Sequence, residues 1–322
     1  MPTTQMAENI TLQINLSPGD VNYAGLTVPA LVKQHPDIGK RLLVVDCCRP
    51  QKTKLVNPDT KYPLAAFNEN VERITAISNA LLKNKTVTDV YYLKPGDGLF
   101  KHLAKKYLNN VYDCTHGAGG TANMSYWAGM ELPETRYVLH YDGDMLLYQK
   151  PGYLWYHEAL DYLANDAKNI FAVPRLCPPV NYPIIDAPSL HEGRPFEALE
   201  NYWKNDWFST RHFLFDKQKL APFLPLVRGQ LMLELLLRKY GRRAFPLDPE
   251  IVLFRSVGGR GGKKIILKNT DAWLLHPATK PQAYLNLLPQ LIEAVTNGKT
   301  PDVQRGNENI NLEAWMNYFE KQ

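Results

Sequence analysis

The chain has 322 residues, of which 45% are apolar and 21% are charged, and its formal net charge is +5. This composition is typical of a globular protein and excludes the disordered, collagen-like and coiled-coil classes. The charge is too small to indicate nucleic-acid binding, and no apolar run approaches the about 18 residues of a membrane span. Four cysteines are too few for a disulfide scaffold, so we expect a cytoplasmic protein with reduced thiols.

The first 150 residues alternate predicted strands with predicted helices. Alternating apolar residues from Leu12 to Leu16 predict a first strand, which ends at the turn Ser17–Asp20. Further strands are predicted at 42–45, 87–93, 110–114 and 136–141, and helices at 26–34, 69–83, 99–107 and 121–130. Short apolar strands between helices predict βαβ units and an α/β fold with a parallel sheet.

The second half of the chain has a different composition. Thirteen aromatic residues fall between Tyr153 and Phe215. Aromatic rings stack on sugars, so this segment predicts an acceptor pocket, with an aromatic core as the alternative. Nine basic residues lie between Arg238 and Lys268, and they predict a positive patch for phosphates, an anionic acceptor or a peripheral membrane contact. A solvated basic face is the plainer interpretation of that stretch.

Asp142-Gly143-Asp144 directly follows a predicted strand. Carboxylates at i and i+2 of an extended chain project to the same side, and the glycine between them lets a ligand approach the backbone. The carboxyl ends of strands form the ligand crevice of open α/β sheets. Hard oxygen ligands favour Mg²⁺ or Mn²⁺, which bridge to a diphosphate. By itself the tripeptide is weak evidence, since aspartates also form ordinary turns.

Four segments in this order resemble the GT-A fold glycosyltransferases, in particular the family 2-like enzymes that carry a DxD motif. They are Gly119–Asn123, Tyr137–Asp144, Asp248–Arg255 and Trp273–Pro277. The resemblance implies a Rossmann-like GT-A fold with a mostly parallel central sheet flanked by helices and a helical C-terminal tail. It implies one domain over 1–280, with a nucleotide-sugar-binding half at 10–150 and an acceptor-binding half at 151–280. A helical extension would follow at 281–322.

The resemblance also implies roles for single residues. Mn²⁺ or Mg²⁺ would be held by Asp142, Asp144 and His276. The nucleotide would be bound by Asn15, Ser17, Asp46, Asn123 and Asp142. The catalytic base would be Glu250, with Asp248 as the alternative. This last segment departs from the family's pattern, because Pro249-Glu250 replaces the usual Glu-Asp pair and the Leu-to-Arg spacing is one residue short.

The function implied is a metal-dependent transfer of a sugar from a UDP- or GDP-sugar to a hydroxyl of a glycan, lipid or small-molecule acceptor. A carboxylate base implies an inverting reaction. Two alternatives are a non-catalytic nucleotide-sugar-binding protein of the same fold and a sugar nucleotidylyltransferase. The second would carry a glycine-rich, basic phosphate loop after its first strand, which Ser17-Pro18-Gly19-Asp20 lacks.

Overall fold

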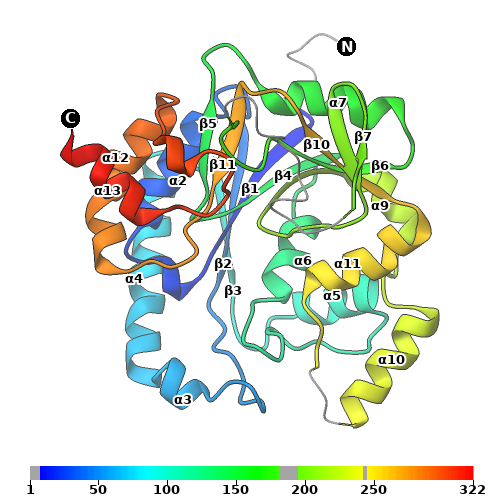
Figure 1. Cartoon of the computed structure of the whole chain (residues 1–322). Coiled ribbons are helices and arrows are strands. Elements are labelled where there is room, and N and C mark those ends of the chain that lie inside the picture. The colour runs from blue at the N-terminus through cyan, green and yellow to red at the C-terminus, as the bar shows by residue number, and fades with distance from the viewer. Residues whose placement is uncertain (1–7, 181–194, 242–244, 322) are drawn as a thin grey trace.

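The computed structural model describes residues 8–180, 195–241 and 245–321. Within them, nine strands form one sheet in the order β3-β2-β1-β4-β9-β6-β10-β8-β7 (Figure 1). These strands are β1 (Ile10–Leu16), β2 (Lys40–Asp46), β3 (Asp89–Leu93), β4 (Tyr137–Asp142), β6 (Asn169–Val173), β7 (Glu197–Ala198), β8 (Tyr202–Asn205), β9 (His212–Asp216) and β10 (Lys263–Leu267). Because only β8 and β9 run against the others, the sheet is mostly parallel, as the sequence predicts.

Helices cover both faces of this sheet (Figure 1). One face packs against α2 (Ala24–Lys33), α4 (Leu64–Lys83) and α7 (Trp155–Asn165). The other face packs against α5 (Leu99–Leu108), α6 (Met124–Glu131), α10 (Gly229–Tyr240) and α11 (Pro249–Ser256). The predicted α/β class with a helix-flanked sheet is therefore confirmed. Shorter helices are α3 (Pro58–Lys61), α9 (Lys217–Leu220), η1 (Pro18–Asp20), η2 (Ala221–Phe223), η3 (Gly258–Arg260) and η4 (Asp302–Gln304).

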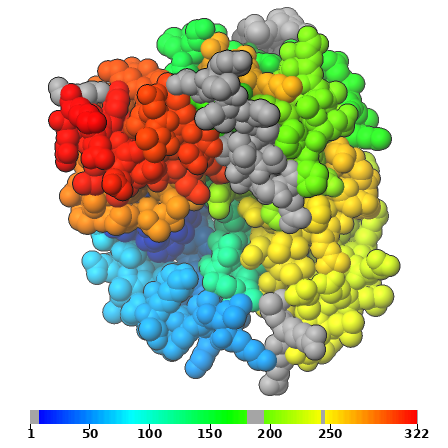
Figure 2. Space-filling view, viewed as in Figure 1, coloured from blue at the N-terminus to red at the C-terminus, as the bar shows by residue number. Residues whose placement is uncertain are grey.

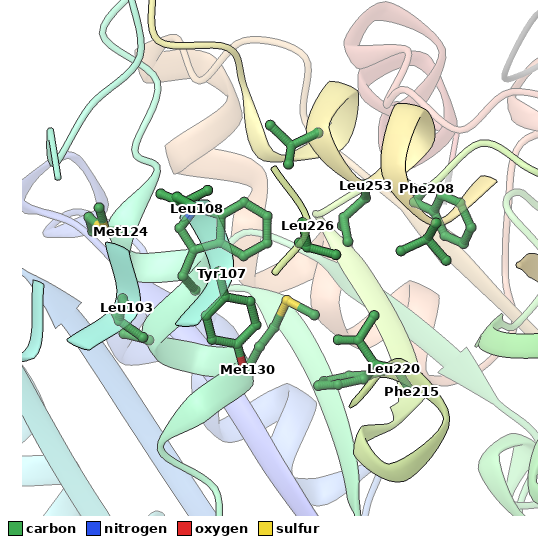
Figure 3. Close-up of a cluster of buried hydrophobic side chains, with 14 of the residues drawn as sticks. Leu103, Tyr107, Leu108, Met124, Met130, Phe208, Phe215, Leu220, Leu226 and Leu253 are labelled. Atoms are coloured by element: carbon green, nitrogen blue, oxygen red, sulfur yellow. The ribbon is translucent and has the colours of Figure 1, made fainter. Parts of the chain in front are cut away.

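The core under α5 and α6 joins the two halves of the chain. Figure 3 shows Tyr107 of α5 and Met130 of α6 in one apolar cluster with Phe215 of β9 and Leu253 of α11. Burying such side chains is the main force that favours folding, at roughly 1.5–3 kcal/mol for each one. This shared core fixes α11 beside α6, and it thereby sets where the amino end of α11 lies relative to the sheet.

A smaller antiparallel pair brings the end of the chain back to β4. It consists of β5 (Leu146–Gln149) and β11 (Ala272–Leu275), and the helices α12 (Gln282–Thr296) and α13 (Leu312–Glu320) follow it. Leu146 and Leu275 are paired and share an apolar cluster with Trp315 of α13. Since β5 begins two residues after Asp144, this pairing places the residues that follow β11 next to the end of β4. The proposed division at residue 280 stays a prediction.

The predicted strand at 110–114 is wrong. Asn109 and Asn110 have φ angles of 52° and 56°, in the left-handed region, and the Asn110 amide donates to the carbonyl of Ala104 at 2.9 Å. The two asparagines thus close α5 and turn the chain. Val111 and Tyr112 are then buried as a loop, so their apolar pattern resembles that of a strand.

The basic stretch at 238–268, which begins inside α10, does not form one exposed patch in the described part of the chain. Arg238 and Arg255 both pair with Glu234, and Lys264 is only 1% exposed. Residues 242–244, which include two of the arginines, lie outside the described residues. Three of the nine basic residues are therefore paired or buried and add no free positive charge to the surface, and for the other members the patch stays a prediction. Among the helices that the structure describes, none has both the length and the hydrophobicity of a membrane span.

A substitution at Gly129 of α6 tests the packing between this helix and the polar face of β1. A Cβ atom at position 129 would lie 2.4 Å from Oε1 of Gln13, which is fully buried and lies 2.5 Å from Nδ1 of His140. We therefore expect Gly129→Ala to lower the free energy of unfolding by about 1–3 kcal/mol, measured by urea denaturation. Gly25→Ala is the control, because a Cβ at this helical position meets nothing within 4 Å. It should leave stability unchanged or raise it, and equal losses in both variants would contradict this account.

Candidate functional site

The site lies where the strand order changes direction. From β1 the chain adds β2 and β3 on one side and β4 on the other, and the carboxyl ends of parallel strands at such a point form a ligand crevice. A pocket of about 150 Å³ opens there. Polar side chains from several elements line it, namely Asn15, Ser17, Asp20, Tyr23, Asp46, Ser125, Tyr126, Asp142, Asp144 and Lys280. The topology thus brings together most of the residues predicted to bind the nucleotide and the metal.

The carboxyl group of Asp142, the last residue of β4, contacts two side chains. Its Oδ2 accepts a hydrogen bond from the Tyr126 hydroxyl at 2.9 Å, and its Oδ1 lies 3.5 Å from Nε2 of His140. Burial and the neighbouring charge of Asp144 raise the pKa of Asp142 well above its ordinary value. Two carboxylates in one low-dielectric pocket repel each other, and a bound cation relieves that repulsion.

Asp144 faces a lysine that the sequence reasoning missed. Its Oδ2 lies 2.7 Å from Nζ of Lys280 and 3.7 Å from Nε2 of His276. Its Oδ1 is buried and has no hydrogen-bond partner in the described part of the chain. Lys280 stands four residues after His276, and this short spacing was the available signal. The positively charged side chain of Lys280 therefore lies in the pocket next to the carboxylates, in a position suited to bind an anionic ligand.

The carboxyl end of β2 carries a buried carboxyl group of which only one oxygen accepts a hydrogen bond from a described residue. Asp46 is 3% exposed, and its Oδ1 accepts from the Cys48 amide at 2.9 Å. Its Oδ2 has no hydrogen-bond partner among the described residues and lies 3.8 Å from Nε2 of His116. Burial raises the pKa of Asp46 to about 7 and lowers that of His116 to about 4. Such a carboxyl oxygen is free to accept from a ribose hydroxyl or a base N–H.

The other predicted nucleotide contacts differ in how they are used. Asn15 is held by Gln13, which donates to its Oδ1 at 2.9 Å, while the Ser17 hydroxyl caps η1. Asp20, also missed from the sequence, accepts from the Ser17 amide at 2.6 Å, and burial raises its pKa to about 6. Asn123 is fully buried and is not among the residues that line the pocket.

The three predicted metal ligands do not form a coordination group as they stand. Within residues 8–180, 195–241 and 245–321, no three histidine, cysteine, aspartate or glutamate side chains are placed to hold a metal ion. Asp142 is turned toward Tyr126, and Asp144 is engaged by Lys280. The chemistry of the donor set nevertheless fits a hard divalent cation. It offers two repelling carboxylates and, on Asp144, a buried oxygen that has no hydrogen bond in this part of the chain.

The two candidate bases begin α11. Oε1 of Glu250 accepts from the Thr210 amide at 3.0 Å, and the negative charge of Glu250 contributes to the raised pKa of Asp142. Burial and then Glu250 raise the pKa of Asp248. Asp248 approaches Gly117 so closely that a Cβ there would lie 2.6 Å from its Oδ1. Glu250 is thus held against the segment before β9 and Asp248 against the loop before α6, and the choice between them stays a prediction.

No protein-family model and no curated protein matches this chain. Two solved structures similar to it are mouse xyloside xylosyltransferase 1 in its apo form and the galactosyltransferase LgtC in complex with donor and acceptor sugar analogues. The first is 13% identical, covers 78% of this chain and 81% of its own, and has a TM-score of 0.38. The second is 11% identical, with coverages of 96% and 94% and a TM-score of 0.37. The names of both proteins are those of glycosyltransferases. Roles for single residues of this chain are argued from its own site.

The raised pKa of Asp46 predicts a pH-dependent stability. The folded state keeps this carboxyl group protonated up to about pH 7, whereas the unfolded chain releases the proton near the ordinary value of 3.8. The contribution of Asp46 is therefore fully present below pH 3.8 and is lost as the pH rises through 7. We expect Asp46→Asn to stabilise the protein by about 4 kcal/mol more at pH 8 than at pH 4, measured by urea denaturation. Asp59→Asn, at an exposed carboxylate, is the control, and a difference from wild type that does not change with pH would contradict the prediction.

Proposed function

We propose that this protein transfers a sugar from a nucleotide-sugar donor to an acceptor hydroxyl in a reaction that depends on Mn²⁺ or Mg²⁺. The observation that supports this most is the pair Asp142 and Asp144 at the point where the strand order changes direction. Asp144 there has Lys280 beside it and a carboxylate oxygen that accepts no hydrogen bond from any described residue. A buried acidic pair next to a lysine suits a ligand that arrives as a metal–diphosphate complex.

In this proposal the donor lies across the ends of β1, β2 and β4. The open oxygen of Asp46 accepts a hydrogen bond from the nucleoside, and Asp142, Asp144 and His276 are the residues that would hold the divalent cation. Lys280 exchanges its bond to Asp144 for one to a diphosphate oxygen. The cation, when bound, offsets negative charge on the departing nucleoside diphosphate. Lys280 adds a second positive charge to the same leaving group.

The acceptor side is assigned to the amino end of α11. Glu250 is held by the Thr210 amide, so its free oxygen has a fixed direction in which to accept a proton from the acceptor hydroxyl. A base on the face opposite the leaving group gives inversion at the anomeric carbon. Inversion is therefore part of the proposal, and Asp248 is the alternative base.

Asp144→Asn tests the donor site. In wild type we expect UDP or GDP to raise the Tm only when Mn²⁺ is present, and we expect this shift to vanish in the variant while the unliganded Tm stays within a few degrees. The amide keeps the size of the side chain but loses the charge that binds the cation. Asp302→Asn, at an exposed carboxylate, should behave as wild type. If no nucleotide shifts the wild-type Tm, with or without metal, the proposed donor site is wrong.

Lys280→Gln tests the role of the lysine. A charge-assisted hydrogen bond to phosphate contributes about 1.5–3 kcal/mol, so the Kd for UDP with Mn²⁺ should rise about 10- to 100-fold in isothermal titration calorimetry. Binding of uridine, which has no phosphate, should change little. An equal loss for uridine and UDP would mean that Lys280 shapes the pocket through Asp144 and does not contact the diphosphate.

A further inference from the structure

A second and larger cleft lies next to the candidate site and has no role in the donor chemistry described above. Its volume is about 760 Å³, against about 150 Å³ for the pocket at the strand ends. It is formed by the loop after β2 at 51–55, the loop before α6 at 114–118, Lys239 near the end of α10, and Phe245 and Pro246. In Figure 2 the light-blue and yellow surfaces stand on either side, with teal atoms between them.

The charge of this cleft is entirely positive among the described residues. Lys52, Lys54 and Lys239 line it, and none of its described lining residues is an aspartate or a glutamate. Lys52 and Lys54 are exposed and have no ion-pair partner in the described ranges, whereas Lys239 donates to the Val111 carbonyl at 2.8 Å. Neighbouring cations without a counter-charge repel one another and attract an anion.

The walls also offer apolar surface. Leu55 is 68% exposed at the rim, and Phe245 and Pro246 line the opposite side. Phe245 is held by an edge contact with Tyr112, at 5.4 Å between ring centroids and an interplanar angle of 80°. A fixed ring beside two free lysines suits a ligand that combines an anionic group with a ring or an apolar body.

The cleft is connected to the candidate catalytic groups through the loop at 114–118. His116 lines the cleft and lies 3.8 Å from Asp46, and Gly117 approaches Asp248. The Thr53 hydroxyl in the loop after β2 donates to the Ala118 carbonyl at 2.7 Å and so connects that loop to the loop at 114–118. A ligand in the cleft would therefore extend toward the candidate bases, while the donor occupies the other side of the loop.

We propose that this cleft binds the acceptor and that the acceptor carries a phosphate group, which Lys52 and Lys54 recognise. The identification of the ligand as the acceptor rests on the proposed sugar transfer. The binding of a phosphate-bearing ligand in the cleft does not depend on it. The acceptor's apolar or ring portion lies against Phe245 and Leu55. Its hydroxyl reaches the amino end of α11 past Gly117.

Cys114 gives a direct readout, because it lines the cleft and is partly exposed, whereas the other three cysteines are buried. Alkylation of Cys114 by iodoacetamide would be followed by peptide mass spectrometry, with phenyl phosphate as the probe and phenyl β-glucoside as its neutral counterpart. We expect phenyl phosphate alone to slow alkylation. In Lys52→Gln/Lys54→Gln its apparent Kd should rise roughly tenfold or more, since two charge-assisted contacts are removed. Lys101→Gln/Lys105→Gln on α5 carries the same change of charge on exposed lysines outside the cleft and should match wild type.

The same assay separates acceptor from donor. Phenyl phosphate should protect Cys114 equally with and without UDP and Mn²⁺, and equally in Asp144→Asn, because the acceptor must bind while the donor is in place. Absence of protection, or equal protection in the Lys52/Lys54 variant, would overturn the anion site. Competition between UDP–Mn²⁺ and phenyl phosphate would assign the cleft to the donor and overturn the acceptor assignment. If UDP binds nowhere but phenyl phosphate still protects Cys114, the sugar-transfer function fails and the phosphate site stands.

Discussion

The repulsion between the carboxyl groups of Asp142 and Asp144 is the constraint on which the site depends. One residue separates them at the end of a buried strand, and burial together with their proximity raises the pKa of Asp142. The positive charge of Lys280 offsets this repulsion at Asp144. Lys280 reaches Asp144 because β11 pairs with β5, which follows the motif directly. The pairing of β11 with β5 thus brings a compensating charge to the motif and also buries apolar side chains. It also leaves the lysine positioned to exchange one anion for another.

A buried polar layer beneath the motif holds the two strands in register. Residues of β1 with odd numbers face α6, and there Gln13 connects Asn15 to His140. Burial lowers the pKa of His140 to about 3, so this histidine is neutral and acts as a hydrogen-bonding group. The network is only partly paired among the described residues, because Nδ2 of Asn15 and Nε2 of His140 have no hydrogen-bond partner there. Gly129 provides the space for it, since any larger residue at position 129 would meet Gln13.

The sequence was most informative where pattern and chemistry coincide. Uninterrupted apolar strands predicted the parallel part of the sheet, and Asp142-Gly143-Asp144 stood at the end of one of them. The error at 110–114 arose because a buried loop and a strand can carry the same apolar residues. Lys280 and Asp20 were missed for another reason, since each acquires its partners through contacts that no local pattern encodes. Composition also does not show which cations of the basic stretch, such as Lys264, become buried.

The loop at 115–123 separates a small acidic pocket from a large basic cleft. Its two ends are joined by the bridge between His116 and Ala122, and Ala122 lines the small pocket while His116 lines the large one. The carboxylates on one side favour a cation, and the lysines on the other favour an anion. Two ligands of opposite charge preference can therefore be held on either side of one short segment. Because Asp248 approaches this loop at Gly117, this candidate base lies where the two compartments meet, which is the arrangement that the proposed transfer between two bound substrates needs.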